Sequence, residues 1–250
     1  LQDIGFAGVE RRVRTLAGVD VADMASLRRA VDETLKAFGR IDYLINNAGI
    51  SGAEEMAVDM EVGAFRHTQF ANLISNYALM QMVVPLMRAQ GSGYILNVSS
   101  YFGGEKFLAV SYPNRTDYAV SKSGQRAMVE SMARHLGPQI QINAIAPGPV
   151  DGDRLAGLGG KPGLFDRRGR LILENKRSDE DWLLRVPPDD VPWLPVAQIA
   201  REAAKVRGGV LSQLHLGKMP TETEVAQATV FFLADRAVSG ETFMPSGGLN

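Results

Sequence analysis

A tyrosine and a lysine four residues apart form the first pair in this sequence whose types and spacing could do chemistry. Tyr118 and Lys122 fall near the start of a predicted helix, where residues i and i+4 share one face. A cation beside a phenol favours the phenolate, so Lys122 is expected to lower the pKa of Tyr118 from its reference value of about 10 toward neutrality. A shift of about 3 units needs about 4 kcal/mol of differential stabilisation, which is plausible in a partly desolvated site. The pair therefore predicts a general acid or base.

The spacing alone leaves a second interpretation open, an exposed helical pair without function, because most surface pairs have none. The neighbouring elements favour function. A strand predicted over residues 94–98 ends just before Ser100, and one predicted over residues 140–146 ends just before Gly148. In a parallel sheet the carboxyl ends of the strands open on one edge, where ligands bind. We therefore expect these side chains to meet the tyrosine at that edge.

Strands and helices alternate through most of the chain. The predicted elements are, in order, a short strand over residues 15–20, a helix that Asp23 caps and Gly39 ends, a buried strand over 41–45, a long helix over 63–89 that accommodates Pro85 as a kink, the strand over 94–98, a helix over 116–136, the strand over 140–146, a helix that runs from a capping box at Thr221 and Glu224 to Leu233, and a last strand over 240–244. This alternation predicts an α/β fold, a Rossmann-like doubly wound parallel sheet with helices on both faces. We expect residues 1–250 to form a single domain.

Residues 151–220 interrupt the alternation and are predicted to form a long insertion that covers the substrate, with a short helix over residues 196–207. In residues 153–177 seven basic side chains outnumber three acidic ones. A solvated basic loop fits this charge equally well, but its position favours an anionic substrate such as a coenzyme A ester. The candidate substrate-binding residues are Arg154 in the insertion and Arg115 just before the tyrosine, where it could hold a carboxylate.

The amino-acid composition and net charge of the chain exclude several classes of protein. A formal net charge of -1 argues against a general nucleic-acid surface, because phosphate binding normally leaves a basic excess. With no cysteine among 250 residues, disulfides, thiolate metal sites and a nucleophilic thiol are excluded. The histidines lack metal-ligand spacing, so we predict no metal site. No apolar run approaches the ~20 residues that cross a bilayer, and the start is not a signal peptide, so we expect no membrane partner and a cytoplasmic location.

Four short motifs follow one another along the chain: Asn46-Asn47-Ala48-Gly49, Asn97-Val98-Ser99-Ser100, Tyr118 with Lys122, and Pro147-Gly148. In this order they resemble the short-chain dehydrogenase/reductase family, over roughly residues 15–150 and 218–250. The resemblance implies an NAD(P)-dependent oxidoreductase in which Tyr118 donates the proton, while Lys122 binds the nicotinamide ribose and acidifies Tyr118. Ser100 would hydrogen-bond the substrate oxygen, with Ser99 as the alternative. Asn72 is similar to the helix asparagine that holds a proton-relay water; its alternative is a solvated helix residue.

The same resemblance implies a set of cofactor-binding residues. Asp20 and Val21 look like the adenine-contacting pair, and Asn46, Ala48 and Gly49 would line the cofactor site, unless Asn46 only ties strands together. The set also includes Tyr118, Lys122, Pro147, Gly148 and Val150. The glycine-rich turn that should cradle the pyrophosphate and the first two strands are missing, so we expect a fragment of a longer protein. The residues alone do not decide whether the cofactor is NADPH or NADH, because that preference depends on the end of the missing second strand.

Longer stretches resemble a narrower family. Residues 112–118, 140–150, 170–177 and 219–222 are similar to the bifunctional malonyl-CoA reductases of bacterial 3-hydroxypropionate metabolism, in the part that reduces the thioester. This resemblance implies NADPH-dependent reduction of malonyl-CoA to malonate semialdehyde. It also implies further domains of the same family in the same polypeptide, and we expect a homo-oligomer. Compared with that family, the stretch over residues 178–195 looks shortened.

The missing thiol constrains the reaction. An acyl group cannot be transferred to a cysteine within this chain, so hydride must attack the bound thioester carbon directly. Ser100 and Tyr118 are then expected to hydrogen-bond the developing oxyanion, and each such donor can be worth roughly 3 kcal/mol. Two other functions stay open, an ordinary ketone or alcohol oxidoreductase of the same family and a non-catalytic domain that serves as a scaffold. The intact set of Ser100, Tyr118 and Lys122 argues against the scaffold.

Overall fold

The centre of the protein is a parallel sheet. The computed structural model describes residues 13–55, 57–103, 115–158, 161–175 and 196–247, and its main sheet has four strands in the order β1-β2-β3-β6. These strands are β1 (Tyr43–Asn46), β2 (Gly93–Val98), β3 (Ile140–Ile145) and β6 (Thr242–Phe243). All neighbours run parallel, so the carboxyl ends of the strands meet at one edge.

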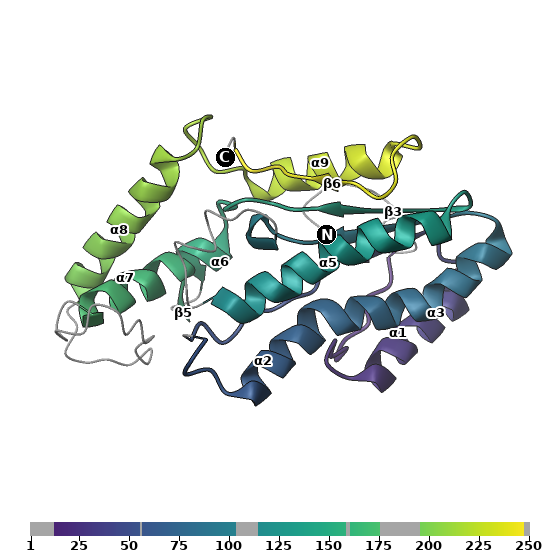
Figure 1. The fold of residues 1–250 in the computed structure, drawn as a ribbon, viewed down its shortest axis with the longest axis horizontal. Helices are drawn as coiled ribbons and strands as arrows, with labels where there is room; N and C mark the ends of the chain where they lie inside the picture. Colours follow the sequence, from purple (N-terminus) through teal and green to yellow (C-terminus); the bar gives the residue numbers. More distant parts are fainter. Residues whose placement is uncertain (1–12, 56, 104–114, 159–160, 176–195, 248–250) are drawn as a thin grey trace.

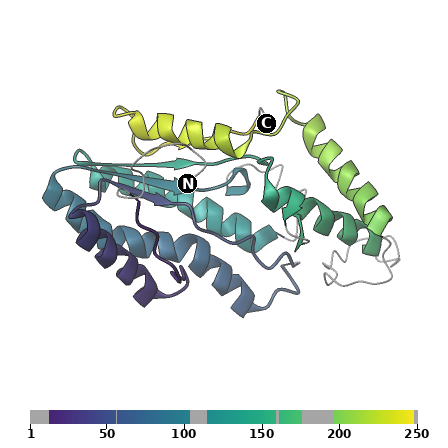
Figure 2. The ribbon, with the colours of Figure 1, turned by 180° about the vertical axis from the view of Figure 1, so that it is seen from behind.

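Helices cover both faces of the sheet (Figures 1 and 2). On one face lie α1 (Met24–Phe38), α3 (Ser75–Gln90) and α5 (Thr116–Leu136), and on the other lies α9 (Glu222–Ala234). Successive side chains of a strand point to opposite faces. Ile95 of β2 therefore joins a buried cluster with Met80 of α3, whereas its neighbour Leu96 joins a cluster with Phe232 of α9. The predicted Rossmann-like doubly wound α/β fold is confirmed.

Local signals in the sequence set the ends of the predicted helices. The Asp23 carboxylate accepts hydrogen bonds from two backbone N–H groups at the start of α1, and Gly39 ends that helix with a left-handed φ of 75°. Thr221 and Glu224 form the predicted capping box of α9. Helix α5 begins and ends where the sequence predicts, which fixes the position of Tyr118 in its first turn.

The first predicted strand and the burial of the second are wrong. Residues 15–20 form no strand, because the first described strand, β1, has β2 as its only described partner and no ladder reaches this segment. The predicted buried strand over 41–45 is β1, but it lies at the edge of the described sheet. Tyr43 and Ile45 of β1 are consequently 44% and 45% exposed.

The insertion forms a small helical unit beyond one end of the sheet (Figures 1 and 2). Its described elements are α6 (Asp153–Ala156), a hairpin of β4 (Gly157–Leu158) and β5 (Lys161–Pro162), α7 (Leu164–Asn175) and α8 (Val196–Ser212). Helix α7 was not predicted, and α8 runs five residues past the predicted end at residue 207. The two helices pack closely at Gly169, where an added Cβ would lie 2.8 Å from the backbone nitrogen of Ala203. The stretch over 178–195 lies outside the described residues.

The helix predicted over residues 63–89 is continuous but contains a wider turn. It consists of α2 (Val62–Gln69), a π-helical segment η3 (Phe70–Ile74) and α3, which includes Pro85. By length and composition it could cross a membrane, but it packs on the sheet and half of its most apolar window is buried, as in the core helix of a globular protein. The π-helical segment was not predicted, and such segments are frequent at functional sites.

Candidate active site

Tyr118 lies at the carboxyl edge of the sheet and is almost fully enclosed. Its exposed fraction is 7%, and it hydrogen-bonds the hydroxyl of Ser100, which follows β2. The ring of Phe102, in the short 3-10 helix η4 (Tyr101–Gly103), meets the Tyr118 ring edge-on with the centroids 5.9 Å apart. The guanidinium carbon of Arg115 lies 4.5 Å from the Tyr118 centroid. The phenol is therefore desolvated and surrounded by polar and cationic groups.

The charges around Tyr118 favour its phenolate. Burial alone raises the pKa of a phenol, because it disfavours the charged form. The cations of Lys122, Arg154 and Arg115, together with the hydrogen bond from Ser100, outweigh that effect and lower the pKa of Tyr118 below its ordinary value. A phenol in this state exchanges a proton near neutral pH more readily than a free tyrosine does.

Lys122 is held in place by two oxygen atoms. Its ammonium donates to the carbonyl of Val98 at 2.8 Å and to Oε1 of Gln125 at 3.4 Å, and the side chain is buried. Burial is the main reason that the pKa of Lys122 is lowered, although the neighbouring Tyr118 acts in the opposite direction. The nitrogen lies 5.8 Å from the Tyr118 centroid, so the lysine and the phenol share one site as the sequence predicts.

The two candidate serines have different partners. Ser99 donates its hydroxyl to the carbonyl of Lys122 at 2.8 Å, which anchors helix α5 to the end of β2. Ser100 instead hydrogen-bonds the Tyr118 phenol and accepts from the backbone of Phe102 at 3.3 Å. The structure thus gives Ser100, and not Ser99, the position beside the phenol.

Asn72 is fully buried, so its interpretation as a solvated helix residue is wrong. Its side-chain oxygen accepts from the backbone nitrogen of Ile50 at 2.8 Å, and its amide nitrogen donates to the Ile50 carbonyl at 3.1 Å and to Ser121 at 3.0 Å. Its own backbone carbonyl accepts a hydrogen bond from Gln125. Because Asn72 sits in the π-helical segment, that irregular turn ties the loop after β1 to helix α5.

Asp117 is a structural centre of the site that the sequence did not indicate. It is fully buried, and its carboxylate accepts from the backbone nitrogen of Ala53 at 2.8 Å, from the Thr68 hydroxyl at 2.7 Å and from the Tyr118 nitrogen at 2.7 Å. Gly52 packs against it with a left-handed φ of 88°, and an added Cβ there would lie 2.6 Å from the carboxylate. The carboxylate therefore joins the loop after β1, helix α2 and helix α5.

Both candidate substrate-binding arginines lie beside Tyr118. The guanidinium carbon of Arg154 lies 5.8 Å from the centroid of the Tyr118 ring, and that of Arg115 lies 4.5 Å from it. Their surroundings differ, since Arg115 is buried in an ion pair with Glu54, whereas Arg154 is exposed and donates to the Ser51 hydroxyl at 2.9 Å. Glu54 is a second residue of the site that sequence reasoning missed.

Most of the predicted cofactor residues follow the strand ends. Asn46 donates to Asn97 at 2.8 Å and so ties β1 to β2, while its side-chain oxygen is buried and has no hydrogen-bond partner among the described residues. An added Cβ at Gly49 would lie 3.6 Å from the Lys122 nitrogen, which places Ala48 and Gly49 beside the lysine. Pro147, Gly148 and Val150 are half-buried after β3.

The predicted adenine-contacting pair lies apart from this group. Asp20 and Val21 are in the turn before α1, where the Asp20 carboxylate accepts from the backbone nitrogen of Ala22 at 2.8 Å. Among the described residues, no hydrogen bond or ion pair joins this turn to Tyr118. The structure therefore brings together the residues predicted for the nicotinamide end and leaves the adenine end separate.

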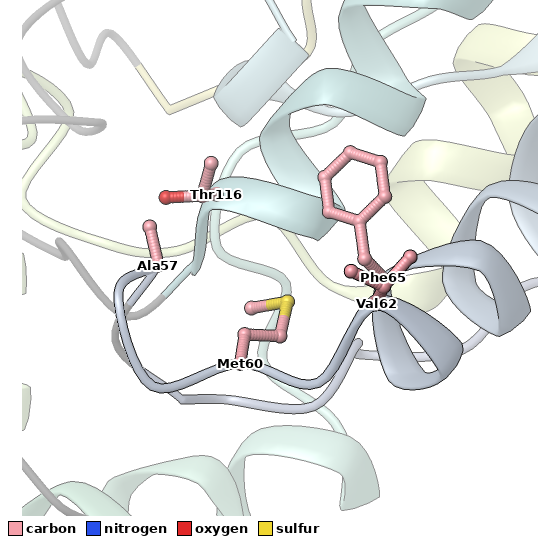
Figure 3. Close-up of a pocket in the computed structure, with 5 residues that line it drawn as sticks. All are labelled: Ala57, Met60, Val62, Phe65 and Thr116. Carbon is pink, nitrogen blue, oxygen red and sulfur yellow. The ribbon is translucent and has the colours of Figure 1, made fainter.

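A hollow lies beside the first turn of α5. It has a volume of about 320 Å³ and is lined by Ala57, Met60, Val62, Phe65 and Thr116, which Figure 3 shows around one space. The lining is apolar except for the Thr116 hydroxyl, and none of the predicted catalytic residues contributes to it.

Comparison with known proteins agrees with this geometry. Residues 7–178 match the family model described as enoyl-(acyl carrier protein) reductase. A trans-4-hydroxycyclohexanecarboxylate dehydrogenase from Sinomonas cyclohexanicum is 32% identical over 82% of this chain and 76% of its own length. This chain belongs to the short-chain dehydrogenase/reductase family. It is therefore an oxidoreductase, and the predicted family is confirmed.

Two further members of the short-chain dehydrogenase/reductase family are informative. The 3-oxoacyl-(acyl-carrier-protein) reductase of Thermotoga maritima is 30% identical over 92% of this chain and 75% of its own length. A crystal structure described as the C-domain, with NADP, of a bacterial malonyl-CoA reductase is 56% identical over the whole of this chain, with a TM-score of 0.87. This chain spans 52% of the chain in that crystal structure, about half its length.

In this member of the short-chain dehydrogenase/reductase family, replacing Gly103 by alanine is expected to disturb Lys122. An added Cβ would lie 2.6 Å from the carbonyl carbon of Lys122, where the nearest atoms belong to the backbone and cannot swing away. Overpacking of this kind costs about 1–3 kcal/mol, and we expect stability to fall by about 2 kcal/mol and turnover with it. Urea unfolding and initial rates measure both effects. The control is Gly63→Ala in α2, where an added Cβ meets nothing within 4 Å; equal stability of the two variants would contradict the expectation.

Proposed function

We propose that this chain reduces malonyl-CoA to malonate semialdehyde with NADPH, as part of a larger bifunctional enzyme that makes 3-hydroxypropionate. The observation that carries the proposal is the 56% identity, over the whole chain, to the C-domain of a bacterial malonyl-CoA reductase described with NADP. The coarser activity, oxidoreduction with a nicotinamide cofactor, follows from the family. Oligomerisation, cytoplasmic location and further domains of the same family in one polypeptide belong to this proposal.

The residues present fit the nicotinamide half of the cofactor. The Lys122 ammonium reaches the carboxyl edge of the sheet, beside Gly49, and the unpartnered side-chain oxygen of Asn46 offers a buried acceptor there. NADPH, when bound, would supply the hydride. Asn46, Ala48, Gly49, Tyr118, Lys122, Pro147, Gly148 and Val150 would hold its nicotinamide end, and Asp20 and Val21 its adenine end.

Ser100 and Tyr118 can act on one substrate oxygen, because their hydroxyl groups are already hydrogen-bonded to each other. As hydride reaches the thioester carbon, that oxygen gains negative charge, and both hydroxyls donate to it. Tyr118 then gives up its proton to form the hemithioacetal, helped by the cations that stabilise its phenolate. The carbon–sulfur bond breaks next, so malonate semialdehyde and the coenzyme A thiol leave. No cysteine of this chain takes part, since it has none.

The anionic parts of malonyl-CoA match the charge of the site. Arg154 is exposed beside Tyr118 and is paired with a neutral hydroxyl, so a carboxylate can bind it without displacing a buried acid. The basic residues of α7 lie in the same insertion and add positive charge there for the coenzyme A phosphates. We therefore assign the malonyl carboxylate to Arg154.

The proposal predicts that NADPH is oxidised only when malonyl-CoA is present, and that one coenzyme A thiol is released for each NADPH oxidised. Cofactor absorbance and a thiol reagent measure the two products in one assay, with NADH and simple ketones as parallel substrates. Turnover of ketones alone would favour the second candidate, an alcohol or ketone oxidoreductase like the Sinomonas dehydrogenase. A chain that binds these ligands but turns over none of them would be a scaffold.

A further inference from the structure

The loop after β1 contains a buried acid in an unusual conformation. Glu54 is 7% exposed and has a φ of 59°, in the left-handed region that only the surrounding structure can impose on a residue with a side chain. The residues just before Glu54 are held in place, since Ala53 donates to Asp117 and Ile50 is bonded to Asn72. The carboxylate of Glu54 is thus directed inward by the backbone itself.

Glu54 binds two arginines from separate parts of the chain. Its Oε1 lies 2.6 Å from Nη1 of Arg115, and its Oε2 lies 3.4 Å from Nε of Arg167 in helix α7. The Arg115 guanidinium is also buried, and burial lowers the pKa of Arg115 while Glu54 raises it. A buried cation without its acid partner is strongly unfavourable, so the Glu54 carboxylate stabilises Arg115 in this position.

Arg115 is directed at the phenol and away from solvent. It lies 4.5 Å from the centroid of the Tyr118 ring and 5.6 Å from that of Phe102. The charged groups that act on Tyr118 are Lys122 within α5, Arg115 before it and Arg154 in α6, while Asp117 and Glu54 act on Arg115. Arg115 helps to lower the pKa of the Tyr118 phenol. Because Arg115 is already ion-paired with Glu54, it attracts a substrate anion less than an unpaired arginine would.

We propose that Glu54 is a positioning residue that clamps Arg115 over the ring of Tyr118, so that Arg115 acts on the phenol only, while Arg154, which also acts on the phenol, binds the acidic end of the substrate. The assignment to Arg154 rests on the proposed function; the clamp does not. Through Arg167 the same carboxylate also joins helix α7 of the insertion to the reaction centre. This division of labour departs from the expectation that Arg115 holds the substrate carboxylate.

The clamp is tested without substrate by measuring the pKa of Tyr118 from the absorbance of its tyrosinate form as the pH is raised. The signal of the other tyrosines is removed by subtracting the titration of the same variant with Tyr118→Phe added. Arg115→Met removes a cation within contact distance and should raise the pKa of Tyr118 by about 1 unit. Glu54→Gln keeps the shape of the side chain but removes the charge that holds Arg115. If Arg115 then swings out to solvent, the pKa of Tyr118 rises as in Arg115→Met. If Arg115 stays in place, the lost negative charge lowers the pKa instead, and a fall or no change overturns the clamp.

The division between the arginines is tested by steady-state kinetics with malonyl-CoA. Arg115→Met and Glu54→Gln should lower kcat about 10-fold and shift its pH profile to higher pH, with KM nearly unchanged. Arg154→Met should raise KM at least about 10-fold. A rise in KM for Arg115→Met as large as that for Arg154→Met, with no shift in the pH profile, overturns the proposal. If the wild type does not turn over malonyl-CoA, the proposed function fails, while the absorbance titration still decides the clamp.

Discussion

Replacing Tyr118 by phenylalanine will remove nearly all turnover and leave coenzyme A binding largely intact. The change deletes one oxygen that both donates to the substrate oxyanion and supplies its proton. Losing an oxyanion donor costs about 10²–10³ in rate, and losing a general acid costs about 10²–10⁴, so we expect a loss of at least about 10³-fold in kcat. The ring itself remains and keeps its contacts with Phe102 and Arg115. Initial rates of NADPH oxidation and calorimetric titration with malonyl-CoA measure the two halves of this prediction.

The matched control is Tyr77→Phe, which makes the same chemical change on an exposed face of α3. Tyr77 is 46% exposed, and its hydroxyl accepts a surface hydrogen bond from Gln81 at 3.2 Å. We expect this variant to keep the wild-type rate. If Tyr118→Phe retained more than about a tenth of the wild-type kcat, the role of Tyr118 as proton donor would be refuted.

Replacing Asp117 by alanine is expected to have the largest effect on stability. The substitution leaves the Ala53 nitrogen without its acceptor and takes from the Thr68 hydroxyl the shorter of its two bonds, and hydrogen bonds to a charged group are worth about 1.5–3 kcal/mol each. We therefore expect the free energy of unfolding to fall by about 3–5 kcal/mol in a urea titration. Turnover should fall too, because the loop that carries Glu54 loses its anchor.

Asp59, an exposed aspartate in the loop that Asp117 anchors, gives the control for this prediction. Asp59→Ala makes the same substitution on the outside of the molecule, where surface changes usually stay within about 0.5 kcal/mol. Equal midpoints for Asp59→Ala and Asp117→Ala would show that the three hydrogen bonds to the Asp117 carboxylate contribute little to stability.

The parts of the fold that depend on local patterns were predictable from sequence. The Asp23 cap, the Thr221 capping box and the bounds of α5 each reflect residues a few positions apart, and the structure has all three where the sequence places them. Strand prediction was weaker, because a strand depends on its neighbours. Residues 15–20 have the composition of a strand but no described partner, and β1 has apolar side chains that lie half exposed at an edge.

The candidate site divides in the same way. Tyr118, Lys122 and Ser100 could be found because their order along the chain resembles that of a known family, and the structure brings them together. Glu54 and Asp117 could not, because their partners lie 61 and 64 residues away and nothing near them in sequence signals a buried acid. A signal was available only for Gly52, a glycine in a loop, which proved to pack against Asp117. Helix α7 was missed because Gly169 and its basic residues made it look like a loop.

The first part of the loop after β1 is held at two points by buried side chains, by Asn72 at Ile50 and by Asp117 at Ala53. Irregular segments usually open on their own, with little of the free energy that holds the core. Here the acceptors are buried side chains of the core, so opening the segment would leave buried polar groups without partners and should cost more than opening a loop held by solvent-exposed bonds. The Arg115–Glu54 part of the environment around the phenol is consequently set by the fold, before any ligand arrives.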